Sequence, residues 1–98
     1  SVVFVDQAWC WAQKRELEKS LTLVDDCFKS LSLVEDDDDI AYINARLHQV
    51  LVACDRQEEA QQYKLVANAA LFRHRKFQQK LLSKILAINM DAQNKNPA

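Results

Sequence analysis

The chain of 98 residues contains no glycine at all. Average usage of about 7% would give a chain of this length roughly seven glycines. Turns of types II, I′ and II′ place residues at positive φ, which glycine adopts at little steric cost. A barrel or sandwich rich in hairpins is therefore disfavoured, and the glycine-rich loops that bind phosphates are missing from the sequence. The composition thus predicts an all-α protein.

Hydrophobic residues make up 49% of the chain and charged residues 28%, which indicates one folded, soluble domain rather than a disordered segment. No apolar run approaches the ~20 residues that a membrane-spanning helix needs, so we expect no contact with a membrane. The first residue is serine, and no signal peptide is recognisable. We therefore expect a domain of a longer cytoplasmic protein.

The three cysteines, Cys10, Cys27 and Cys54, are widely spaced and form no C-x-x-C pair. Neither a zinc site nor a redox dithiol is therefore indicated. Each cysteine lies in an apolar helical pattern, where a thiol behaves as a small buried hydrophobe. We expect all three to pack in the core of a protein that resides in a reducing compartment.

Apolar residues recur at steps of three and four along the chain, which is typical of amphipathic helices. The stripes are Phe4, Ala8 and Trp11; Leu17, Leu21, Val24, Phe28 and Leu31; Ile40, Ile43, Leu47, Val50, Leu51 and Cys54; Ala60, Tyr63, Ala67, Ala70 and Leu71; and Phe77, Leu81, Ile85 and Ile88. No helix-breaking residue separates Ala60 from Met90. One long helix and two helices with a kink near residues 73–76 are therefore both compatible with the pattern.

Five consecutive acids, residues 35–39, interrupt the apolar pattern. Their mutual repulsion disfavours a helix interior, whereas acidic side chains stabilise the first turn of a helix. A calcium loop of the EF-hand type needs alternating ligands, a glycine and a terminal glutamate, and this run lacks that spacing. We expect a solvated loop that leads into the next helix, and no metal site.

Residues 47–67 carry a recognisable combination of leucines, acids and small residues. Leu47 and Leu51 are followed by the acidic pair Glu58-Glu59 with Ala60, and then by Ala67. The stretch resembles a tetratricopeptide repeat, a helix–turn–helix unit of about 34 residues. It departs from that pattern at His48, which replaces a small residue, at Asp55, which replaces the turn glycine, and at Tyr63, which comes one residue early.

A weaker copy of the same pattern precedes it, with Ser20 standing where Ala60 stands in the second unit. The other residues of this copy are Trp11, Leu17, Glu18, Lys19 and Cys27. The offset from Ser20 to Ala60 exceeds the usual period, and the acidic run accounts for the excess.

The resemblance implies antiparallel helix pairs in a right-handed stack, within a single domain over residues 1–90. Its repeat-like units would cover about residues 4–34 and 40–72. A closing helix would cover about residues 77–90, and a polar tail would follow over residues 91–98. An unrelated helical bundle is the alternative.

In such repeats a peptide or a partner helix lies in the groove formed by the first helix of each pair, and this implies a groove lined by Trp9, Asn44, Arg46 and His48. Trp9 and Trp11 are two residues apart and cannot share one helix face, so we expect Trp11 in the core. Trp9 is then either partly exposed as a contact for a partner or packed against the next helix. The implied function is protein–protein interaction, as a scaffold or adapter in a signalling or regulatory protein.

Charge divides the chain, because residues 1–63 hold six Lys/Arg and thirteen Asp/Glu (6 − 13 = −7), whereas residues 64–98 hold seven and one (7 − 1 = +6). The basic patch consists of Arg73, Arg75, Lys76, Lys80 and Lys84. A solvated helix face is its simplest interpretation. A homodimer that joins acidic and basic surfaces is an alternative, and so, less favoured, is nucleic-acid binding.

Catalysis finds no support in the sequence. His48 and His74 are not spaced as a pair of metal ligands, and no nucleophile stands in a recognisable catalytic pattern. We therefore expect no enzyme activity, no catalytic residue, no metal and no cofactor.

Overall fold

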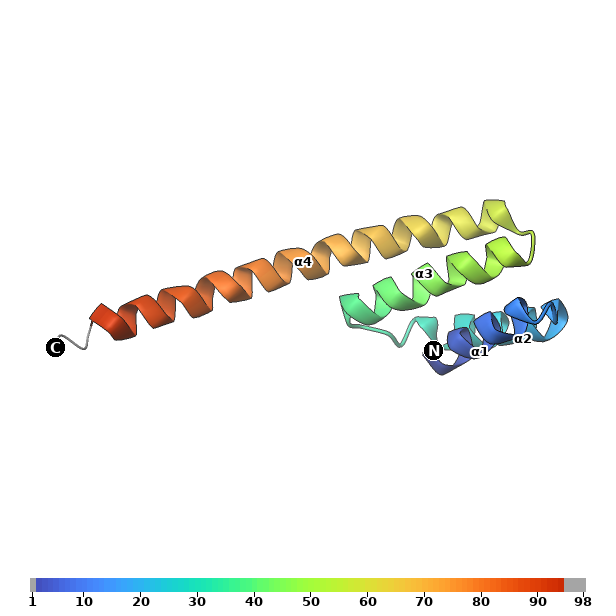
Figure 1. Cartoon of the computed structure of the whole chain (residues 1–98), viewed down its shortest axis with the longest axis horizontal. Coiled ribbons are helices and arrows are strands. Elements are labelled where there is room, and N and C mark those ends of the chain that lie inside the picture. The colour runs from blue at the N-terminus through green and yellow to red at the C-terminus, as the bar shows by residue number, and fades with distance from the viewer. Residues whose placement is uncertain (1, 95–98) are drawn as a thin grey trace.

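The computed structural model describes residues 2–94, which form four α-helices and no strand (Figure 1). The helices are α1 (Val2–Gln13), α2 (Leu17–Leu31), α3 (Asp37–Ala53) and α4 (Gln57–Asn94). The prediction of an all-α protein is confirmed. The acidic run also lies where it was expected, because Asp36 directly precedes α3 and the next three aspartates form its first turn.

Two of the three turns contain a residue at positive φ, although the chain has no glycine to take that conformation. Arg15 and Asp55 adopt the left-handed conformation, with φ of 65° and 61°, directly after α1 and α3. In the second turn the N–H of Arg56 donates to the carbonyl of Leu51 at 2.8 Å, and the N–H of Asp55 donates to that of Val52 at 3.1 Å. The first turn has the equivalent pair of bonds. Both are Schellman motifs in which a non-glycine residue takes the position that glycine usually occupies.

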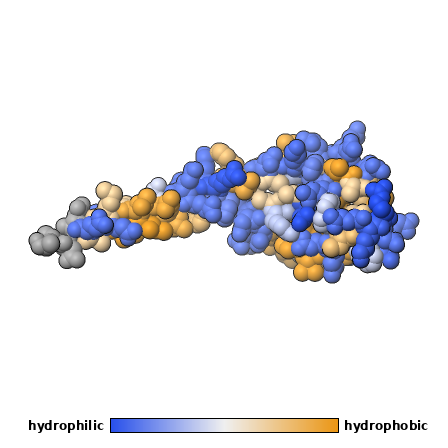
Figure 2. Space-filling model, in the orientation of Figure 1, coloured by the Kyte–Doolittle hydropathy of each residue, from blue (hydrophilic) through white to orange (hydrophobic). Residues whose placement is uncertain are grey.

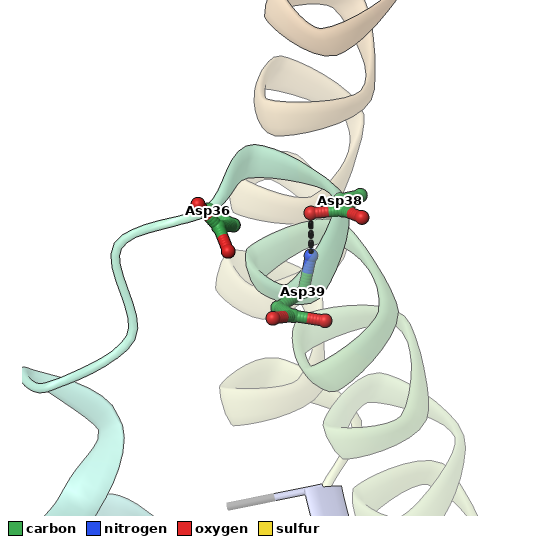
Figure 3. A group of neighbouring side chains, drawn as sticks. All are labelled: Asp36, Asp38 and Asp39. Atoms are coloured by element: carbon green, nitrogen blue, oxygen red, sulfur yellow. Dashed lines mark hydrogen bonds between the residues drawn. The ribbon is translucent and has the colours of Figure 1, made fainter.

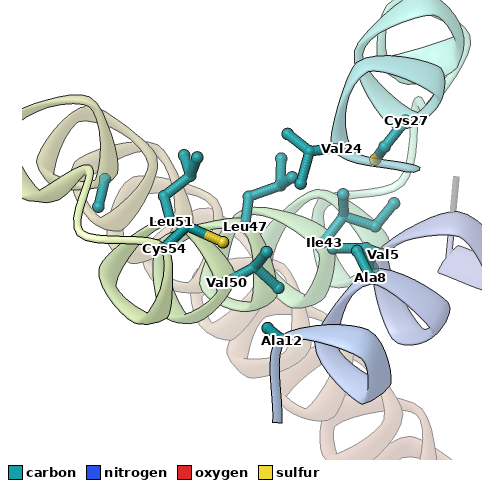
Figure 4. Packing of buried hydrophobic residues seen from close by; sticks show 11 residues of the cluster. Val5, Ala8, Ala12, Val24, Cys27, Ile43, Leu47, Val50, Leu51 and Cys54 are labelled. Carbon is teal, nitrogen blue, oxygen red and sulfur yellow. The ribbon is translucent and has the colours of Figure 1, made fainter. Parts of the chain in front are cut away.

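The core lies where α1, α2, α3 and the start of α4 meet (Figure 4). α3 contributes the largest fully buried side chains, Ile43, Leu47 and Leu51. The complete cluster is Val5, Ala8, Ala12, Val24, Cys27, Ile43, Leu47, Val50, Leu51, Cys54 and Ala60. The predicted stripe of α3 is therefore the side that is buried, whereas α1 buries Val5, Ala8 and Ala12 in place of the predicted Phe4, Ala8 and Trp11.

Ser20 and Ala60 were expected at equivalent places in two repeat-like units. Each is the fourth residue of its helix, and each has no exposed surface. Because the Ser20 side chain is polar, it needs a partner in the core, and its hydroxyl donates to the carbonyl of Ala8 at 2.7 Å. Small side chains at both places allow the neighbouring helices to approach closely.

α4 is one uninterrupted helix of 38 residues. At 1.5 Å per residue it is about 57 Å long, and it accounts for the 68 Å long axis of the molecule. The radius of gyration is 19.3 Å, whereas about 13 Å is usual for a compact chain of this size. Residues 77–90 thus continue α4 and form no separate closing helix. Residues 91–94 of the expected polar tail are helical, and residues 95–98 lie outside the described range.

α3 covers only the first part of α4 (Figure 1). Near one end His48 contacts the backbone of Ala60, and near the other Arg73 pairs with Asp37. Beyond Arg73 the helix projects away from the other three, and we call residues 74–94 the overhang. Among residues 2–94, no helix is long and apolar enough to cross a bilayer.

The cysteine prediction holds for two of the three residues. Cys27 and Cys54 are buried, with exposed fractions of 0% and 8%, but Cys10 is exposed. Cys10 lies between the residues of α1 that face the core, Ala8 and Ala12. An apolar stretch with two tryptophans therefore gave a misleading indication of burial at this position.

We expect the large core residues of α3 to dominate stability. Leu47→Ala should lower the free energy of unfolding by about 2–5 kcal/mol, because Leu47 has no exposed surface and the change leaves a cavity. Leu82→Ala is the matched control, since Leu82 is 57% exposed on α4 and should cost less than about 1 kcal/mol. Urea denaturation measures both. Equal losses in the two variants would contradict this description of the core.

We expect glycine to be favourable at the two left-handed turn positions. Arg15→Gly and Asp55→Gly should each raise the free energy of unfolding by up to about 1 kcal/mol, and more for Arg15, because aspartate tolerates positive φ better than arginine does. Ser32→Gly is the control, since Ser32 has a φ of −66° and gains nothing from the replacement. Thermal unfolding of the three variants checks the order. A stabilised Ser32 variant with no gain at the turns would refute it.

Candidate functional site

The overhang carries a continuous row of large apolar side chains that nothing covers within residues 2–94. The row, which we call the apolar stripe, consists of Phe77, Leu81, Ile85 and Ile88, with exposed fractions of 62%, 47%, 47% and 66%. It appears as an orange patch on the projecting part of α4 (Figure 2). Leu82 and Leu86 widen it on one edge, with exposed fractions of 57% and 54%.

The apolar stripe lies on the same side of α4 that contacts α3 in the first part of the helix. Ala60, Ala67 and Ala70 are buried there, and they precede the stripe at steps of three and four along the helix. His74 is half-buried and lies at the transition. The fully or nearly fully buried residues of α4 are alanines, with the half-buried Tyr63 packed between them against the core, whereas the stripe residues of the overhang are large and exposed. No element among residues 2–94 covers the overhang as α3 covers the first part of α4.

An ion pair marks the place where the cover by α3 ends. Nε and Nη2 of Arg73 both lie 3.0 Å from Oδ1 of Asp37, which is the first residue of α3. One hydrogen bond, from Nε, and the close approach of Nη2 to the same charged oxygen orient this contact between the two helices. It shows how an acidic side chain on a covering helix pairs with a basic side chain on α4.

The rest of the predicted basic patch extends along the overhang. Lys76 lies over the ring of Phe72, with its Nζ atom 4.8 Å from the centroid. Lys76, Lys80 and Lys84 line one shallow hollow together with Gln79 and Ser83. Within residues 2–94 none of these three lysines forms an ion pair with an acid. The overhang has four Lys/Arg and one Asp, a formal net charge of +3 with His74 neutral.

Two of the four residues predicted to line a groove come together on the surface of α1 and α3. The guanidinium carbon of Arg46 lies 5.5 Å from the ring centroid of Trp9, and 5.8 Å from that of Tyr42. Asp6 completes the cluster, because its carboxylate accepts a hydrogen bond of 2.7 Å from the Tyr42 hydroxyl. Sequence reasoning missed Tyr42, although it precedes Arg46 by one helical turn.

The other two predicted groove residues do not join this cluster. Asn44 is only 3% exposed, and its amide nitrogen donates to the carbonyl of Ile40 at 2.8 Å. His48 is half-buried, with Nδ1 3.0 Å from the carbonyl oxygen of Ala60. The side chain of Asn44 is thus hydrogen-bonded within α3, and that of His48 contacts α4. This corrects the prediction that both side chains line an open groove.

Of the expectations for the two tryptophans, the core position of Trp11 is corrected. Both are half-buried, and it is Trp9 that packs against the core cluster. Trp11 lies on the outer side of the α1–α2 pair, where the Nζ atoms of Lys14 and Lys19 are 5.4 and 4.4 Å from its ring centroid. Cation–π contacts of this kind shield an exposed indole from water.

Three of the aspartates at the start of α3 lie close together. Their ligand atoms, from Asp36, Asp38 and Asp39, fall within 4.8 Å of one another, and all three residues are exposed (Figure 3). Oδ1 of Asp38 accepts a hydrogen bond of 2.9 Å from the backbone N–H of Asp39. The carboxylates are placed at the positive end of the helix dipole, which accounts for their positions without a ligand.

Two ionisable groups, one buried and one half-buried, have raised pKa values. Burial raises the pKa of the Cys27 thiol, and burial followed by the nearby charge of Glu59 raises the pKa of Tyr63. The Tyr63 ring stacks on Phe28, with 5.4 Å between centroids. Both shifts favour the neutral form, so neither group is prepared to act as a nucleophile or base near neutral pH.

Comparisons of the chain with models of known protein families, with curated proteins and with solved structures gave no match. The surfaces described above, and the helices that place them, are therefore the basis for any functional conclusion.

We expect the three cysteines to differ sharply in reactivity. Native protein treated with iodoacetamide at pH 8 should take up one adduct, on the exposed Cys10, because Cys27 is inaccessible and the raised pKa keeps its thiol protonated. Mass spectrometry of tryptic peptides locates the adduct. Cys10→Ser should stay unlabelled until denaturant is added, and native labelling of Cys27 at a rate similar to that of Cys10 would contradict the structure.

Proposed function

We propose that this chain is a non-catalytic protein–protein interaction domain of the helical-repeat type, an adapter within a larger cytoplasmic signalling or regulatory protein. The uncovered apolar stripe on α4 is the observation that carries the proposal. Contiguous exposed apolar surface of this kind, bordered by polar residues, marks protein interaction sites.

The arrangement of the helices supports the repeat-type architecture. A Schellman turn joins α1 to α2, and another joins α3 to α4. In both pairs a fully buried small residue, Ser20 or Ala60, stands one turn into the second helix. On this proposal the four helices form two antiparallel tetratricopeptide-like pairs in a right-handed stack. The far end of α4 then offers its stripe to whatever packs next in the assembly.

The stripe is large enough to matter energetically. Burial of one Leu, Ile or Phe side chain contributes about 1.5–3 kcal/mol, and these four are about half covered by their own helix, so roughly 3–6 kcal/mol remains available. Association costs of about 4–15 kcal/mol must be met as well. The stripe therefore needs additional contacts from its partner, and the lysines beside it and the Trp9–Arg46 cluster are the charged and aromatic groups that could supply them.

Self-association is the second candidate function. The exposed aspartates at the start of α3 and the unpaired lysines of the overhang could meet across two copies of the chain. Such a dimer would weaken with salt, because exposed charge pairs are screened at about 0.5 M salt. A monomer in sedimentation at both low and high salt would rule it out. Nucleic-acid binding by the lysines leaves the apolar stripe unexplained and is the weaker hypothesis.

Site-specific photo-crosslinking tests the proposed function. A benzophenone amino acid placed at Phe77 or Leu81, in cells that produce the full-length protein, should give adducts that protease removes and nuclease does not. Leu65 is the matched control, since it has the same 62% exposure as Phe77 but lies on the side of α4 turned away from α3. Equal adducts at Leu65 and Phe77, no adducts at all, or nuclease-sensitive adducts would contradict the proposal.

A further inference from the structure

We infer that the occupant of the apolar stripe is an acidic amphipathic helix of a partner protein, which lies end to end with α3 along α4. This inference rests on the proposed function and adds the secondary structure, charge and placement of the partner. It is carried by three observations: the continuity of the stripe with the face that α3 covers, the change in side-chain size along it, and the unpaired lysines beside it.

α3 shows how this face of α4 is covered. α3 has 17 residues, about 26 Å of helix, and it covers α4 from the neighbourhood of Ala60 to that of Arg73. The overhang of 21 residues continues the same face for about 32 Å. A helix of similar length to α3 fits this space.

The spacing and the size of the stripe residues favour a helix as the occupant. Apolar side chains at steps of three and four form the ridges that pack into the grooves of another helix. The buried alanines at positions 60, 67 and 70, which have only Tyr63 as a large neighbour on this face, give way to phenylalanine, leucine and isoleucine at positions 77, 81 and 85. Since interaxial distances of about 8–10 Å depend on these side chains, the partner helix lies farther from α4 than α3 does, or has small residues in its contact face.

The charge beside the stripe selects an acidic partner. At 3.6 residues per turn, Lys84 and Lys80 border one edge of the stripe, whereas Leu82 and Leu86 border the other. The Asp37–Arg73 pair already provides an acidic partner for α4 where α3 covers it, but Lys80 and Lys84 have none among residues 2–94. An overhang from a second copy would bring its own charge of +3 against these lysines, and like charges repel.

The acidic cluster at the junction further restricts the partner. Asp36, Asp37 and Asp38 line a hollow together with His74 and Phe77, at the point where the occupant would meet α3. Acidic side chains at this end of the partner helix would be repelled. The acids of the partner are therefore expected opposite Lys80 and Lys84, beyond the first turn of the overhang.

Two synthetic helical peptides of 17 residues test the inference on the purified chain. Both carry the same Leu/Ile stripe, with glutamates at the flanking positions in one and lysines in the other, and fluorescence anisotropy measures binding. The acidic peptide should bind at least about tenfold more tightly than the basic one at low salt. Lys80→Glu combined with Lys84→Glu should reverse that preference, a result that a general effect on folding would not produce.

Variants of the stripe complete the design. Leu81→Ser with Ile85→Ser should weaken binding of the acidic peptide about tenfold or more, because both side chains lose their apolar contacts. Leu65→Ser, on the opposite side of α4, should leave it unchanged. Circular dichroism should show equal helix content in all variants, since these positions are outside the core.

The outcomes separate this inference from the proposed function. Equal binding of both peptides, no binding of the acidic peptide, or a preference unchanged in the charge-reversed variant would overturn the inference, even if crosslinks at Phe77 and Leu81 still identify a protein contact. A stable dimer in sedimentation that Leu81→Ser with Ile85→Ser abolishes would overturn it in favour of a second copy. A single-stranded oligonucleotide that displaces the acidic peptide would overturn it in favour of nucleic acid.

Discussion

Burial of α3 between α1 and α4 is the interaction on which the rest of this structure depends. Ile43, Leu47 and Leu51 are the largest fully buried side chains, and α3 supplies all of them. α4 packs on the opposite side through alanines, which bring the two helices close but contribute little buried area of their own. The position of α4, and with it the direction of the overhang, is therefore fixed by α3.

The absence of glycine determines how the helices are connected. A helix that reverses direction in three residues commonly needs a left-handed residue at its end, and here arginine and aspartate take that conformation. Such a conformation costs about 1–2 kcal/mol for a residue with a Cβ atom. The turns form despite this cost because packing on both sides of each turn holds the helices together.

The fold class and the core residues of α2 and α3 could be predicted from the sequence, because period and burial are two consequences of the same amphipathic pattern. The continuity of α4 could not, since the absence of a helix breaker permits both a straight and a kinked helix. Cys10 and Asn44 were assigned to the wrong environments. The exposure of a residue at the edge of an apolar face depends on where the neighbouring helix lies, and one helix's sequence does not contain that information.

The candidate site, too, could be predicted only in part from the sequence. Spacing alone identified Phe77, Leu81, Ile85 and Ile88 as one face of a helix, but a face that reads as core in the sequence is exposed in the structure. The sequence contains a further signal at this boundary. A helix packed on its own domain through alanines and Tyr63 carries phenylalanine, leucine and isoleucine where the cover ends, and large apolar side chains exposed in this way favour association with another surface. The exposure of a row of large apolar side chains, more than apolar character itself, thus distinguishes the part of α4 that is available to a partner from the part that builds this domain.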